Sequence, residues 1–258
     1  AKAKLNEFYV SEESRKSNKL GQTSSTELLY STIRVLSQFA EAYCNDNDKC
    51  AEQYNDLSFV ASFYENYVVG ERTGDDYFFL LIGAIANILS DNFGNAKSLI
   101  NKICREKIDN EIAILLFEYM ANGLGKTYEV LYTCEELRDE YYYHLIDEIV
   151  HDTGSVYLYK LRKFSNELLS RNDSESAFYG LMLWAIHKKF LENSAARIIP
   201  ISAASTLQDW YDYFSQKYAI RILWQAQRLM IESGVLRGES ATIQLPTGVG
   251  KTKSIELI

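Results

Sequence analysis

The sequence predicts an all-α body followed by the start of an α/β domain. Only two prolines, Pro200 and Pro246, occur in 258 residues, and long stretches lack clusters of turn-forming residues. Apolar residues recur at spacings of three and four over most of the chain, which is the period of an amphipathic helix. A different pattern follows residue 241, where a short β-branched and apolar run meets a glycine-rich loop.

The elements are expected in this order. Residues 1–24 are polar and rich in serine and lysine, so a flexible N-terminus is predicted. Residues 24–44 predict a helix with Ser25 as N-cap candidate. Its apolar stripe comprises Leu28, Leu29, Ile33, Leu36, Phe39 and Tyr43. Further helices are predicted near residues 50–69, 75–92, 95–107, 110–122, 128–150, 156–171 and 174–193.

The domain boundary is predicted near Pro200. A residue before proline is pushed out of the helical region, so an element should end at Ile199. The chain then divides into a flexible start, a helical accessory domain, a connector with a short helix, and a C-terminal segment. Their ranges are 1–24, 25–199, 200–215 and 216–258.

A phosphate-binding loop is predicted in the closing run TIQLPTGVGKTKSIELI. Residues 241–245 suit a short buried strand, and the chain from Lys253 onward suits a helix start. Glycines let backbone N–H groups point into one hollow, and the helix N-terminus adds its dipole, so the loop can hold a polyphosphate. The candidate binding residues are Thr247, Gly248, Val249, Gly250, Lys251 and Thr252.

Two of these side chains have separate tasks. Lys251 would reach the β- and γ-phosphates as a point charge, and the Thr252 hydroxyl would ligate the magnesium ion that bridges them. The general loop pattern has glycine where this chain has Leu245. The longer form L-P-T-G-x-G-K-T resembles motif I of superfamily 2 helicases and translocases of the DEAD/DEAH type. The resemblance implies ATP and Mg as cofactors.

The same five-residue core occurs once more, at 123–127 (GLGKT). Its context differs, because the preceding run DNEIAILLFEYMAN has helical spacing, with Asp109 as the expected cap. A phosphate loop requires strand, loop and helix in that order. We therefore interpret residues 123–127 as a helix end and a turn.

The segment before the loop predicts one helix over residues 216–233, ended by Gly234. It resembles the Q-motif region of superfamily 2 helicases, where a glutamine upstream of motif I holds the adenine, since an amide complements its N6 and N7. Leucine, tryptophan, two residues and glutamine fall on Leu223, Trp224 and Gln227. The resemblance makes Gln227 the adenine-binding residue, with Gln225 as the alternative.

This resemblance covers residues 216–258, one sixth of the chain. It implies the start of a RecA-like domain that is truncated after motif I, and DNA or RNA as a partner through the missing helicase core. Phosphoryl transfer also needs an acidic box and an arginine finger, which would follow later. We expect an N-terminal fragment of an ATP-dependent helicase or translocase that does not itself hydrolyse ATP. A self-contained kinase is disfavoured for the same reason.

Charge is unevenly distributed. Residues 216–258 hold six Lys or Arg against three acidic residues, so the net charge of −8 leaves −11 for residues 1–215. Such a domain repels nucleic acid. This charge balance favours an alternative function, in which the helical domain binds a protein partner or inhibits the helicase core.

The remaining candidates are weaker. His144, Glu148 and His151 share one helical face, where a solvated acidic surface is favoured over a metal site, and Tyr141–Tyr143 are assigned to packing rather than base stacking. The cluster at 187–189 is too small for nucleic-acid contact. Four cysteines lack C-x-x-C spacing, which favours reduced thiols and a cytoplasmic protein over a Cys44–Cys50 disulfide. The run at 77–89 is too short to span a membrane, so no membrane partner is expected.

Overall fold

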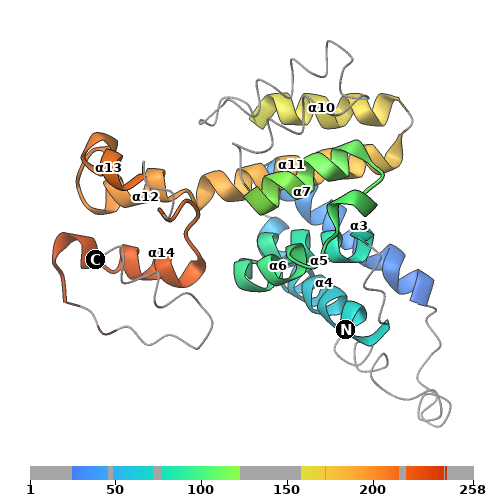
Figure 1. Ribbon diagram of the computed structural model, residues 1–258, viewed down its shortest axis with the longest axis horizontal. Coiled ribbons are helices and arrows are strands. Elements are labelled where there is room, and N and C mark those ends of the chain that lie inside the picture. The colour runs from blue at the N-terminus through green and yellow to red at the C-terminus, as the bar shows by residue number, and fades with distance from the viewer. Residues whose placement is uncertain are drawn as a thin grey trace, which may run out of the picture. The chain divides into compact units, whose positions relative to one another are not determined.

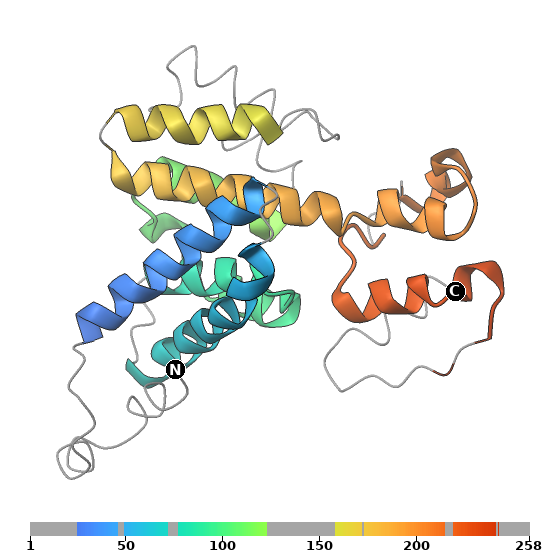
Figure 2. The ribbon, with the colours of Figure 1, turned by 180° about the vertical axis from the view of Figure 1, so that it is seen from behind.

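The computed structural model describes residues 25–45, 49–71, 77–122, 158–171, 173–214, 219–240 and 242. Helices make up the regular structure of this part of the chain, which contains no strand. The predicted all-α body is thereby confirmed for the described residues. They form two compact units, one with residues up to Ser90 and Asn95–Ile186, the other with Asp91–Gly94 and residues from His187 onward. Figures 1 and 2 show the helices from opposite sides.

The first unit is built around the helix α5, which is buried from Leu80 to its end at Leu89. Its helices are α3 (Ser25–Cys44), α4 (Lys49–Glu71), α5 (Tyr77–Leu89), most of α6 (Phe93–Ile100), η1 (Arg105–Lys107), α7 (Glu111–Asn122), α10 (Leu158–Ser170) and the first part of α11 (Ser174–Glu192). Every residue from Leu80 to Leu89 is buried. A helix that is apolar all round must be covered on all sides, so α5 forms the centre of this unit.

Small and hydroxyl-bearing residues allow α3, α4 and α5 to pack closely. A Cβ added to Gly83 would lie 3.0 Å from both the Tyr64 Cβ and the Leu99 Cδ1, so this glycine permits close contact with α4 and α6. The Tyr64 hydroxyl also shares a buried 2.9 Å hydrogen bond with the Thr32 hydroxyl of α3. This bond satisfies two polar groups that would be costly to bury alone.

The beginnings of α5, α7 and α11 are joined by side-chain hydrogen bonds. The Tyr77 hydroxyl donates to the Asp109 carboxylate, and the Asn110 Nδ2 donates to the Ser176 hydroxyl at 3.0 Å. The Asn110 Oδ1 accepts from the amides of the second and third residues of α7. The N-cap of α7 is therefore Asn110, and the prediction of Asp109 was wrong because its carboxylate is held by Tyr77. Burial, and then this hydrogen bond, raise the pKa of Tyr77.

A second glycine lets α10 approach α11. A Cβ on Gly180 would lie 2.9 Å from the Leu168 Cδ1 and 3.6 Å from the Ser165 Cα. The two helices run side by side in Figures 1 and 2. Leu161, Phe164 and Leu168 of α10 are buried, which matches the predicted helical spacing.

The second unit consists of short helices around a small hydrophobic cluster. It contains the end of α11, α12 (Ala195–Ser202), η4 (Leu207–Trp210), α13 (Tyr211–Phe214), α14 (Gln225–Glu232) and η5 (Val235–Arg237). The cluster comprises Ala195, Ile199, Phe214, Ala219, Ile220, Leu223, Met230 and Ile231.

Three predicted helix boundaries were wrong. Helix α12 continues through Pro200 to Ser202. Proline removes only its own N–H donor, and the Ala203 N–H still donates to the Ile199 carbonyl at the end of the helix. The helix predicted at 95–107 ends at Ile100. A turn follows it, and Ile103 in this turn is buried. Helix α14 begins at Gln225, since residues 221–223 pair with the backbone after α11.

Two predicted features, the flexible N-terminus at 1–24 and the helix near 128–150, lie outside the described residues. Within the described ranges, none of the helices has the length and apolar character needed to cross a bilayer.

Candidate functional site

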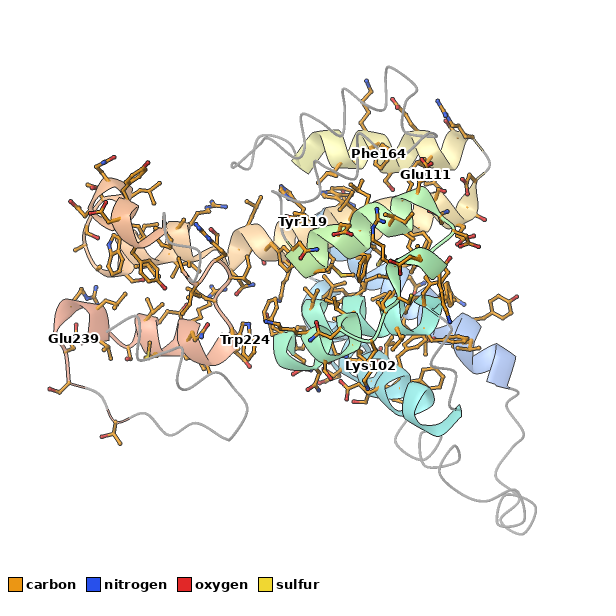
Figure 3. The ribbon with its side chains drawn as sticks, viewed as in Figure 1. Lys102, Glu111, Tyr119, Phe164, Trp224 and Glu239 are labelled. Atoms are coloured by element: carbon orange, nitrogen blue, oxygen red, sulfur yellow. The ribbon has the colours of Figure 1, made fainter. Side chains whose placement is uncertain are left out.

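The start of α14 is the best-defined part of the predicted site. Trp224 is its N-cap, with extended backbone at φ −76° and ψ 157°. A tryptophan side chain has no acceptor for the amides of the first turn, so the usual N-cap contribution from the side chain is missing. Figure 3 shows Trp224 and Glu239 at opposite ends of the segment formed by α14 and η5.

Gln227 supplies the reciprocal half of the cap. Its Oε1 accepts a hydrogen bond from the Trp224 N–H at 2.9 Å, the contact that a glutamine at the third helical position makes in a capping box. The side chain is 3 % exposed, whereas Gln225 is exposed. The two glutamines therefore differ in their surroundings: the Gln227 amide is buried in the cap, whereas the Gln225 side chain is exposed. The hydrogen bond also determines which end of the amide is the oxygen, because a backbone N–H requires an acceptor.

The backbone before α14 is held by two hydrogen bonds. The Ala195 N–H donates to the Arg221 carbonyl at 2.9 Å, and the Leu223 N–H donates to the Asn193 carbonyl at 2.8 Å. An isolated antiparallel bridge between Ser194 and Ile222 lies between them. Because Leu223 is also fully buried, the chain enters α14 from a fixed position within the second unit.

Packing holds the inner face of α14. Met230 and Ile231 are 3 % and 1 % exposed and belong to the cluster of the second unit. On the outer face, Arg228 and Glu232 form an exposed pair at 2.9 Å, one helical turn apart. The Gln227 amide therefore sits on a helix whose apolar face is anchored and whose polar face is solvated.

The predicted phosphate-binding residues Thr247–Thr252 lie outside the described residues, including Lys251 and Thr252. The second GKT copy at 123–127 lies outside them too, although the helix predicted before it is confirmed as α7, which ends at Asn122. The same holds for His144, Glu148 and His151, and for the tyrosines at 141–143. Within the described ranges, no three His, Cys, Asp or Glu side chains are grouped so that they could hold a metal ion.

The basic residues His187, Lys188 and Lys189 are all buried. The Lys189 Nζ forms an ion pair with the Asp91 carboxylate at 2.8 Å, and its side chain is 10 % exposed. Asp91 has a left-handed backbone, with φ at 64°. The pair lies within the second unit, where it fixes residues 91–94 to the end of α11.

Sequence reasoning missed the backbone N–H of Trp224 as the partner of Gln227. No local signal marks Trp224 as the N-cap, since the spacing of residues 216–233 predicts one continuous helix through it. Comparison with protein-family models, with curated proteins and with solved structures finds no match.

Proposed function

We propose that this chain is the N-terminal part of an ATP-dependent helicase or translocase of superfamily 2. The observation that carries the proposal is the octapeptide Leu245–Thr252, LPTGVGKT, placed downstream of a glutamine-bearing helix. This order of helix, glycine turn and phosphate loop supports a RecA-like domain start at residue 216.

The residues of the loop suit magnesium-ATP chemically. Gly248 and Gly250 leave their backbone N–H groups open to phosphate oxygens, Lys251 neutralises phosphate charge, and the Thr252 hydroxyl is a hard oxygen ligand for magnesium. Bound ATP would supply the phosphoryl group whose transfer drives movement on DNA or RNA. In this proposal Gln227 binds the adenine. Its side chain is 3 % exposed and its Oε1 accepts the Trp224 N–H, so base binding requires this buried amide to become accessible.

The test compares two lysines that share one local motif. In the full-length protein, Lys251→Ala should abolish nucleic-acid-stimulated ATP hydrolysis, because the phosphate charge loses its partner. Lys126→Ala should leave the rate nearly unchanged, since a helix, α7, precedes its motif instead of a strand. Equal losses from both substitutions would contradict the assignment of residues 245–252 as the phosphate loop.

A second function is favoured by charge. Residues 1–215 carry a net charge of −11, which opposes nucleic-acid binding and suits a protein partner or a restraining contact with the motor. An affinity pulldown with the 258-residue chain, set beside a nucleic-acid mobility shift, separates the two, since ending the chain at residue 215 would divide the hydrophobic cluster of the second unit. A mobility shift at physiological salt without a retained protein partner would contradict this second function.

A further inference from the structure

We draw no further inference here: the strongest candidate, the exposed apolar surface patch of the second unit at Ile201 of α12 and Leu207 of η4, whose side chains are 79 % and 56 % exposed, carries nothing because nothing in the structure shows what covers it.

Discussion

The Gln227 Oε1 accepts the Trp224 N–H at 2.9 Å and thereby caps α14. This contact gives Gln227, which the helicase resemblance proposes as the adenine-binding residue, a structural task in the second unit. Its side chain is buried, so the cap depends on one orientation of its amide.

The first prediction concerns the two glutamines. Gln227→Met keeps the side-chain volume but removes the cap, so the second unit should lose about 1 kcal/mol of stability. Gln225→Met, at an exposed position of the same turn, should change stability by less than about 0.5 kcal/mol. Urea unfolding followed by Trp fluorescence measures both. Equal effects would show that the cap contributes nothing.

Much of the fold was predictable because the apolar spacing repeats without interruption. The predicted spans of the helices now described as α3, α4, α7 and α11 agree with the structure to within two residues at each end. The boundaries that failed depend on partners distant in sequence. The neighbouring sequence does not show that the Leu223 N–H donates to the Asn193 carbonyl. Nor does it show that the Tyr77 hydroxyl bonds to Asp109, so that Asn110 is the N-cap of α7.

The second prediction compares Gly83 with Gly180. Alanine is about 1 kcal/mol more favourable than glycine in a helix interior, so the helix propensity of both substitutions is stabilising. At Gly83 the new methyl meets the Tyr64 Cβ, which cannot move without the α4 backbone, and overpacking of about 1–3 kcal/mol should prevail. At Gly180 the nearest atom is the tip of Leu168, which can rotate, so Gly180→Ala should be close to neutral. Thermal melts followed by circular dichroism would test this, and a stabilised Gly83→Ala would refute it.

The third prediction concerns pH. The Asp173 Oδ1 accepts the Ser176 N–H at 3.0 Å and caps α11, and hydrogen bonds from Ser176 lower the pKa of Asp173. A lowered pKa means that this stabilisation is present above the unfolded value of about 3.9 and is lost as pH falls through the folded value. Asp173→Ala should therefore cost about 1 kcal/mol at pH 7, and the difference from wild type should shrink below about pH 4.

The matched variant for this cap is Asp173→Asn, which keeps an acceptor oxygen but does not titrate. Its stability at pH 7 should exceed that of Asp173→Ala, since asparagine caps helices well. Chemical denaturation at pH 7 and pH 3 measures all three proteins. A difference between wild type and Asp173→Ala that is the same at both pH values would contradict the assignment.

The fourth prediction concerns the left-handed residue Asp91 and its partner Lys189. Asp91→Ala and Asp91→Gly both remove the ion pair with Lys189. Only the alanine variant is also destabilised, by about 1 kcal/mol, by the left-handed backbone at this position. The alanine variant should be the less stable by that amount. Measured free energies of unfolding that rank glycine below alanine would show that the backbone at Asp91 changes when the ion pair is lost.

The burial of Leu80–Leu89 in α5 has a consequence for how the first unit exchanges its amide hydrogens with solvent. From Leu80 to Leu89 no residue faces water, so fraying of one helical face cannot expose these N–H groups. Their exchange requires the surrounding helices to separate, which means an opening of the whole unit. The deuterium uptake of this ten-residue stretch therefore measures the global stability of the first unit without any denaturant.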